Sequence, residues 1–215
     1  DFLPFYVNPR AAIIMEYADQ AELDRFMQMH PNIEVIELIM PDFSGIPRCK
    51  RIQRSEFKRL FSGTFLSPQS APLLGVRGNF YETTPYPELG GDPDQIIRPV
   101  AGTLAVVPWY ESPVAQVLVA YTDERGELDW VDTRCPLVSV LNKFAASGLR
   151  PTVATELEFF LFEKSFDQIR KEKFRDLEPI SGYNEDYHIL QTTKEEHVMR
   201  PLRNHLWNAG IPVEN

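Results

Sequence analysis

The chain has 215 residues, of which 43% are hydrophobic and 25% are charged, and its formal net charge at pH 7 is −9. A chain of this length and composition can bury a core of its own. Its acidic balance argues against nucleic acid as a partner, because phosphates attract a basic face. Cys49 and Cys135 lie far apart and outside any metal-binding spacing, which favours a reducing compartment. No signal peptide and no apolar run of about 20 residues is evident, so we expect a soluble, cytoplasmic protein without a membrane partner.

The first 61 residues predict an alternation of short helices and strands. Asp19 and Glu22 have the spacing of a capping box, and Pro31 is expected to end the helix that follows. Ser55 is expected to cap a second helix. In chain order, we expect these elements at residues 19–30 (helix), 33–40 (strand), 46–53 (strand antiparallel to the first) and 56–61 (helix).

The middle of the chain predicts a long irregular segment and then a hairpin. Residues 62–95 are rich in Gly, Pro and Ser and show no sustained periodicity, which is typical of functional or mobile loops. Gly126 is expected to close a four-residue hairpin loop, where a glycine can adopt positive φ. Around this region, we expect strands at residues 103–109, 115–122 and 127–133.

The last third of the chain predicts a helix, a strand and another helix. Regularly spaced apolar residues favour a helix over residues 137–148. Residues 152–162 (TVATELEFFLF) are rich in β-branched and aromatic residues and predict a strand. Thr193 and Glu196 have capping-box spacing at the start of the last helix, and Pro201 is expected to kink it.

Two glutamates in the predicted strand 152–162 are candidate metal ligands. Because side chains alternate between the faces of a strand, Glu156 and Glu158 would share one face, about 7 Å apart at the backbone. Carboxylates buried in a sheet must be paired, hydrogen-bonded or metal-bound, and oxygen ligands of this kind suit Mg²⁺ or Mn²⁺. Alternatively, the pair marks the solvent-exposed end of a strand. The residues alone leave both interpretations open.

Several segments together resemble the glutamine synthetase family, especially its branch of γ-glutamyl-amine (polyamine) ligases. They are PDFSGIPRCKRI, GDPDQIIRPVAGTLAVVPW, AQVLVAYTDERG, VDTRCPL and FAASGLRPTVATELEFFLF. The likeness extends from about residue 22 to residue 164 in the same order and spacing, and it continues more weakly toward the end. It implies an α+β fold, with an N-terminal β-grasp-like domain in residues 1–131 and the incomplete beginning of the catalytic domain in residues 132–215.

The resemblance also implies an activity. Members of this family use ATP to convert glutamate into γ-glutamyl phosphate, and ammonia or an amine then displaces the phosphate. The likeness places Glu156 and Glu158 at the family's metal-binding E-x-E pair, which would hold Mg²⁺ or Mn²⁺. Active sites in the family lie between the subunits of a ring. The implied partners are therefore glutamate, ammonia or a small amine, and further copies of the same protein.

Three further residues match positions of the family. Asp42 matches an acidic residue that the N-terminal domain lends to the neighbouring subunit's active site, where a carboxylate can hold the cationic amine and help to remove its proton. Asp before Phe-Ser-Gly is also an ordinary turn former. Tyr187 lies where the family often places an aromatic near the nucleotide, although core packing is an alternative. Glu214 matches a glutamate that borders the nucleotide site, although it could equally be a solvated terminal residue.

The sequence departs from the family in ways that bear on activity. The family's VDPR is VDTR here, with Thr133 in place of the proline. We expect the chain to lack the family's G-Q-x-E metal segment, its glutamate-binding loop and its catalytic arginines, so these 215 residues alone are predicted to be inactive. Three functions stay open: ligation of glutamate to a small amine, glutamine synthesis with ammonia, and a non-catalytic role in assembly or regulation.

Overall fold

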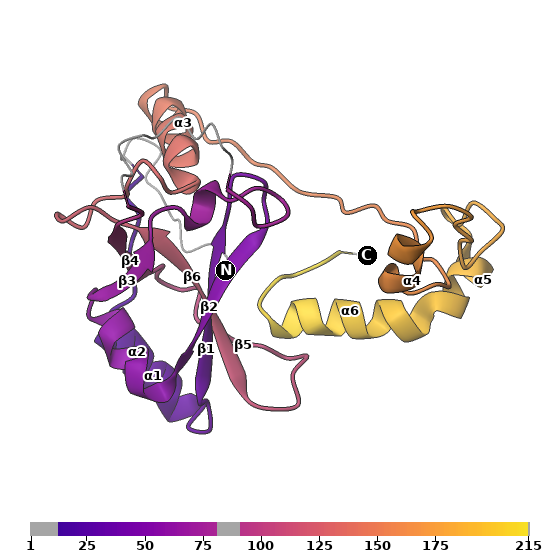
Figure 1. Cartoon of the computed structure of the whole chain (residues 1–215), viewed down its shortest axis with the longest axis horizontal. Coiled ribbons are helices and arrows are strands. Elements are labelled where there is room, and N and C mark those ends of the chain that lie inside the picture. The colour runs from indigo at the N-terminus through magenta and orange to yellow at the C-terminus, as the bar shows by residue number, and fades with distance from the viewer. Residues whose placement is uncertain (1–12, 81–90, 215) are drawn as a thin grey trace. The chain divides into compact units, whose positions relative to one another are not determined.

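The computed structural model describes residues 13–80 and 91–214. The chain forms two compact units, and the boundary between them lies between Pro151 and Thr152 (Figure 1). The domain boundary predicted between residues 131 and 132 falls inside the first unit, where Asp132 is fully buried. That this boundary separates two folding domains stays a prediction. Among the described residues, no helix has the length and apolarity that crossing a membrane requires.

A mixed six-stranded sheet organises the first unit. Its two central strands, β1 and β6, are parallel, whereas the other neighbouring strands are antiparallel. Ile36 of β1 lies opposite Ile52 on one side and Ala115 on the other. The order across the sheet is β2 (Pro47–Gln53), β1 (Val35–Pro41), β6 (Val114–Tyr121), β4 (Asp94–Pro99) and β3 (Phe65–Pro68), and β5 (Ala105–Val106) pairs with β6.

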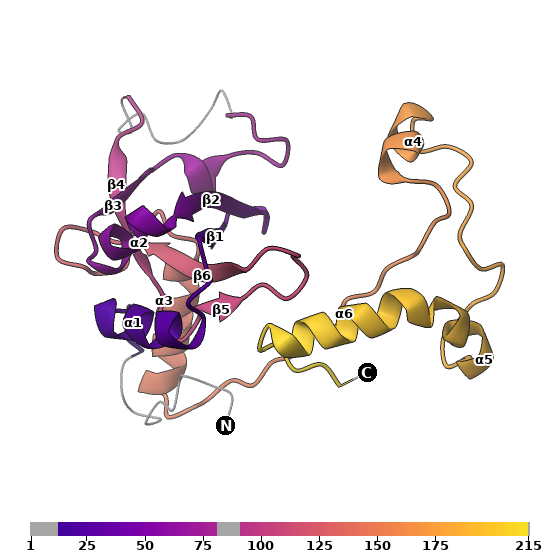
Figure 2. The ribbon, with the colours of Figure 1, turned by 90° about the horizontal axis from the view of Figure 1, so that it is seen from below.

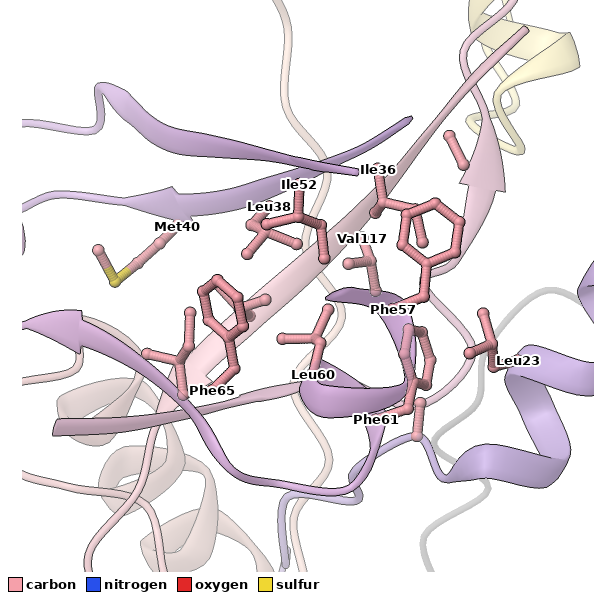
Figure 3. Packing of buried hydrophobic residues seen from close by; sticks show 14 of the residues in the cluster. Leu23, Ile36, Leu38, Met40, Ile52, Phe57, Leu60, Phe61, Phe65 and Val117 are labelled. Carbon is pink, nitrogen blue, oxygen red and sulfur yellow. The ribbon is translucent and has the colours of Figure 1, made fainter. Parts of the chain in front are cut away.

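Two helices, α1 (Gln20–Met29) and α2 (Arg54–Phe61), cover one face of this sheet (Figure 2). Alternate side chains of the central strands point to that face and are buried there, as the period of a strand requires. Leu60 of α2 is fully buried, and Figure 3 shows it pointing toward Val117 of β6. Hydrophobic burial at about 25 cal/mol per Å² makes this core the main source of stability in the first unit.

The helices predicted in the first 61 residues are present, but their ends differ in detail. Asp19 caps α1 as predicted, because its Oδ1 accepts a hydrogen bond from Glu22 N–H at 2.9 Å. The Glu22 carboxylate instead accepts from Gly102 N–H at 3.0 Å. The prediction that Ser55 caps α2 is wrong: the helix begins at Arg54, and β2 runs directly into it without a side-chain cap.

The middle of the chain is more regular than predicted in one place and less regular in another. The segment 62–95 contains β3, the 3₁₀ turn η1 (Ala71–Leu73) and the start of β4. The strand predicted over residues 127–133 is wrong, since only a single bridge joins Thr122 to Leu128. The chain turns inward there because the Asp132 carboxylate, rather than a neighbouring strand, accepts the Tyr121 N–H.

The predicted strand 152–162 is also wrong. Residues 152–161 form neither helix nor strand, and only Phe162 makes a bridge, to Pro179. No backbone N–H group of residues 152–160 donates a hydrogen bond to another described residue. A strand forms only where a neighbour pairs with its backbone, and the described part of the second unit supplies no such neighbour.

Helices make up the regular structure around and after this segment. They are α3 (Arg134–Ala146) in the first unit, and α4 (Phe166–Lys171), α5 (Ile189–Thr192), η2 (Thr193–Glu195) and α6 (Glu196–Asn208) in the second. The capping box predicted at Thr193 and Glu196 is wrong, because the Thr193 hydroxyl donates to Ile189 O at 2.7 Å. Pro201 lies inside α6, which continues to Asn208.

Candidate functional site

Asp42 begins the turn that follows β1, and its carboxylate is fully engaged. Oδ1 accepts hydrogen bonds from Ser44 N–H at 2.8 Å and from Ile46 N–H at 2.9 Å. Oδ2 accepts from Arg48 Nε at 2.9 Å and lies 2.8 Å from Arg48 Nη2. The side chain has no exposed surface. In this structure the carboxylate therefore orders its own turn and does not face solvent.

The surroundings of Asp42 keep it ionised. Burial alone would raise its pKa, but the hydrogen bonds from Ile46 N–H, the Arg48 guanidinium and Ser44 N–H outweigh burial and hold the pKa below its ordinary value. At neutral pH the group is an anion of low basicity. It can attract a cation, whereas a proton would bind it only weakly.

Arg48 connects this turn to the loop after β3. Besides pairing with Asp42, its Nη2 donates to Gly75 O at 2.7 Å, and Phe43 N–H donates to Pro72 O at 3.2 Å. The Phe43 side chain is 56% exposed, so the tip of the turn presents an aromatic ring. Sequence reasoning missed Arg48. The hairpin register could have revealed it, because Arg48 lies opposite Met40, two residues before Asp42.

Glu156 and Glu158 lie on the irregular segment 152–161 and are exposed. Their apolar neighbours are exposed as well, with Leu157 at 87% and Phe160 at 83%. Within residues 13–80 and 91–214, neither carboxylate has a hydrogen bond or ion pair, and no group of three or more His, Cys, Asp or Glu could hold a metal ion. The residues present therefore do not make a metal site, and no reaction step through a metal follows from this structure.

The two residues expected near the nucleotide also lie in the second unit. Tyr187 is fully exposed with a positive φ of 59°, so the alternative that it packs in a core is wrong. Glu214 is exposed and outside any helix or strand. In the described part of this unit, no hydrogen bond or ion pair joins Tyr187 or Glu214 to the glutamate pair. The structure brings none of these four residues together.

The VDTR segment, residues 131–134, contacts the edge of β6 beyond the last residue of β6 that pairs with β1. The parallel pairing of these strands ends at Ile39 and Leu118. Farther along β6, Asp132 Oδ2 accepts from Tyr121 N–H at 2.9 Å, and Arg134 Nη2 donates to the Val119 carbonyl. Two side chains thus replace a neighbouring strand. From the sequence, this segment was recognised only as part of the family resemblance, and its contacts with β6 were not predicted.

Curated relatives align with most of the chain. A γ-glutamylputrescine synthetase of Escherichia coli is 31% identical over 146 residues, which is 68% of this chain and 31% of the relative. A γ-glutamylethanolamide synthetase of Streptomyces coelicolor is 30% identical over 190 residues, covering 86% and 40%. A type-1 glutamine synthetase of Dictyostelium discoideum is 24% identical over 189 residues, covering 83% and 34%. The chain belongs to the glutamine synthetase family. The resemblance predicted from the sequence is thereby confirmed, including its likeness to ligases that form γ-glutamyl amides.

The chain matches only part of the length of each relative. The chain spans 31 to 40% of the length of these three proteins. No family model matches it. The superposition on a solved Plasmodium falciparum glutamine synthetase includes 58% of this chain and 22% of that protein, at 14% identity and a TM-score of 0.38. This structural likeness is too low to support an argument.

Proposed function

We propose that the protein containing this chain is an ATP-dependent ligase that joins the γ-carboxylate of glutamate to an amine through γ-glutamyl phosphate. The observation that carries this proposal is the identity of 30 to 31% with two relatives named for γ-glutamyl products, putrescine in one and ethanolamine in the other. The glutamyl part is common to both names, and the amine differs. Glutamate is therefore the proposed constant substrate, with a small amine or ammonia as the variable one.

The proposed catalytic role of Asp42 depends on its ion pair with Arg48. The carboxylate makes four polar contacts, two with backbone N–H groups of its own turn and two with the Arg48 guanidinium of β2, so a cationic amine could approach it only if Arg48 moved aside. Its lowered pKa favours holding a cation over accepting a proton. Asp42 is accordingly proposed to hold or steer the amine as a fixed anion, with Phe43 as the exposed contact of the same turn.

ATP and a divalent ion, Mg²⁺ or Mn²⁺, are the proposed cofactors. Carboxylate oxygens are the ligands that such ions prefer, which is the reason to propose Glu156 and Glu158 as ligands. These two residues lack a third partner among the described residues, so the ion would need further ligands from elsewhere. Tyr187 and Glu214 are proposed to border the nucleotide.

The finer architecture is also a proposal. The hairpin of β1 and β2, with β1 parallel to the later strand β6, supports a β-grasp-like N-terminal domain, followed from residue 132 by the start of the catalytic domain. A homo-oligomeric ring in the cytoplasm, with active sites between subunits, completes this proposal. Light scattering of the native polypeptide tests the assembly.

Activity is tested on the longest native polypeptide that contains these residues. Phosphate release is measured with ATP, Mg²⁺ and glutamate, in the presence of putrescine, ethanolamine or ammonia, and the product is identified by mass spectrometry. We expect release that requires both glutamate and one of the amines, together with a γ-glutamyl amide. Failure to form such an amide with any of them would contradict the ligase and favour the role in assembly or regulation.

The metal assignment is tested by a matched pair of variants. Glu158→Gln is expected to lower the affinity for Mn²⁺, measured by electron paramagnetic resonance, by more than the roughly 100-fold that loss of an outer-shell partner costs. Glu163→Gln changes an exposed glutamate that follows this segment by two residues, and it is expected to leave Mn²⁺ binding unchanged. Equal Mn²⁺ affinity in both variants would remove Glu158 from the site.

A further inference from the structure

Three side chains of the first unit contain buried polar atoms without a hydrogen-bond partner among the described residues. These atoms are the hydroxyl oxygen of Tyr17, Nε of Arg98, and Nε and Nη1 of Arg134. Native proteins leave few buried polar groups unsatisfied, and each such group needs an explanation, for example a bound ion. All of these atoms carry a proton that they can donate. The ligand that fits them is therefore rich in acceptors.

These side chains converge on one short stretch of the pairing between β4 and β6. Tyr17 forms a bridge with Val100, two residues after Arg98. Arg134 donates from Nη2 to the carbonyl of Val119, which lies beside the residue of β6 that pairs with Arg98. The Arg98 guanidinium carbon is 5.9 Å from the centre of the Tyr17 ring, and the charges of Arg98 and Arg134 both act on the Tyr17 hydroxyl. The unsatisfied donors thus form one cluster.

Two loops fix the position of the Arg98 guanidinium. Arg98 leaves β4 on the face opposite the hydrophobic core, because the preceding residue, Ile97, points into that core. A Cβ added at Gly63 would lie 3.0 Å from the guanidinium carbon, and one added at Gly126 would lie 3.6 Å from it. The guanidinium is therefore held between two stretches of backbone, and the fold sets its orientation.

No ion pair balances the charge of Arg98, since no carboxylate of a described residue lies within 4.0 Å of its guanidinium. Asp132 belongs to the same cluster, but it accepts from Tyr121 N–H and from Arg134 N–H at 2.9 Å each. Glu127 is exposed, so water and salt screen its charge. Arg98 is half-buried, and a cation removed from water costs free energy unless it is paired. A bound anion would pair it, whereas a water molecule would not.

A hollow of about 720 Å³, open to solvent, gives access to this cluster. It lies between α3 and the segments 13–17 and 126–128. Tyr17 and Gly126 line it, and both adjoin the Arg98 guanidinium. Of the Arg98 nitrogens only Nε is buried without a partner, so the two Nη atoms remain within reach of a ligand. Burial raises the pKa of Tyr17 to about 12, and its hydroxyl therefore stays a donor at neutral pH.

We propose that Arg98 and the Tyr17 hydroxyl bind a small oxyanion, a phosphate or carboxylate group, at the inner wall of this hollow. The guanidinium presents N–H groups in a planar fork that matches two oxygens of such a group, and Tyr17 supplies a further donor. Arg134 adds positive charge nearby while it stays bonded to the carbonyl of Val119. These residues take no part in the proposed ligase reaction, so the site does not depend on that proposal.

Calorimetric titration of the longest native polypeptide that contains these residues tests the site, with inorganic phosphate and acetate as probes at constant ionic strength. We expect saturable binding of phosphate and weaker binding of acetate, because phosphate offers more acceptor oxygens and more charge. Tighter binding of acetate would assign the site to a carboxylate group. Absence of binding of both anions at millimolar concentrations would overturn the proposal.

Variants locate the site. Arg98→Gln is expected to weaken the binding of phosphate at least about tenfold, because a charge-assisted hydrogen bond is lost, and Tyr17→Phe about fivefold. Arg25→Gln makes the first change at an exposed position of α1 and is the matched control. Phosphate bound at a ligase active site would be unaffected by all three variants, which separates it from this site. Equal phosphate affinity of Arg98→Gln and the control would refute the site.

Far-UV circular dichroism checks that the variants fold. Tyr17→Phe keeps the aromatic ring beside the guanidinium and removes only the hydroxyl, so it decides the matter if Arg98→Gln fails to fold. Phosphate affinity in Tyr17→Phe equal to that of Arg25→Gln would then reject the site. Arg98→Lys retains the charge but not the planar fork, and it is expected to recover part of the phosphate binding that Arg98→Gln loses.

Discussion

The two units of the chain differ in how much they bury. In the first unit, alternate side chains of the central strands β1 and β6 are buried, and Ile36, Val117 and Leu60 have no exposed surface. In the described part of the second unit, Ile169 is the one buried hydrophobic side chain, whereas Tyr187 is fully exposed. Burial provides the free energy that offsets the conformational entropy of ordering a chain. The first unit therefore contains its own framework, whereas the expected metal- and nucleotide-binding residues lie on segments with little packing of their own.

The largest expected effect on the free energy of unfolding comes from comparing two leucine truncations, one in each unit. Leu60→Ala empties a fully buried position and is expected to lower the free energy of unfolding by about 3 kcal/mol. Leu157→Ala changes a side chain that is 87% exposed and is expected to change it by less than about 0.5 kcal/mol. Urea denaturation measures both. A loss from Leu157→Ala as large as that from Leu60→Ala would show that residues 152–162 are packed after all.

The turn at Asp42 gives the next largest effect. Arg48→Met leaves the buried Asp42 carboxylate without its ion-pair partner, and we expect a loss of about 3 kcal/mol in the free energy of unfolding. Arg51→Met removes a similar pair with Glu37, but the Arg51 side chain is 60% exposed, so we expect little change. Equal stability of the two variants in urea would contradict the structural role assigned to Arg48.

The same turn predicts a pH dependence. Because the pKa of Asp42 is lower in the folded chain than its ordinary value, the unfolded chain binds the proton more tightly, and stability is lost as the pH falls below about 4. Above that pH the contribution is fully present. Asp42→Asn is expected to flatten this part of the curve in urea denaturations between pH 3 and about 6. An unchanged slope in that variant would mean that other carboxylates account for the acid sensitivity.

A glycine pair gives the smallest effect. Gly126 has a φ of +82°, and an added Cβ would lie 3.6 Å from the Arg98 guanidinium, so Gly126→Ala is expected to cost about 1 kcal/mol. Gly182, in the second unit, has no positive φ, and no described atom lies within 4 Å of the point that an added Cβ would occupy, so Gly182→Ala is expected to be neutral. Thermal unfolding compares them, and a neutral Gly126→Ala would argue against the hairpin geometry at this position.

Local signals predicted the first elements well. The Asp19 cap, the stop at Pro31 and the alternation along residues 33–40 each depend on a few adjacent residues, and the structure contains α1 and β1 there. In contrast, β3 and β4 lie partly in a segment rich in Gly and Pro, and their pairing with each other is a contact between distant residues. No local period predicts such a contact.

The errors at the candidate site have the same physical origin. Residues 152–162 have the composition of a strand, but composition does not supply the neighbour that a strand needs. The family resemblance selected Asp42, but it did not reveal that Arg48 neutralises it, because the ion pair follows from the register of the β1–β2 hairpin. Tyr187 could be placed near a core or near a nucleotide from the sequence, and only its full exposure excludes the core.

Native-state hydrogen exchange resolved by residue tests the contrast between the units most directly. The account predicts strong protection of amides in the paired strands β1 and β6 and exchange near the unprotected rate for residues 152–160, whose N–H groups have no acceptor among the described residues. Protection of the Glu156 and Glu158 amides equal to that of Val117 would contradict it, because those glutamates would then belong to a formed sheet within this chain.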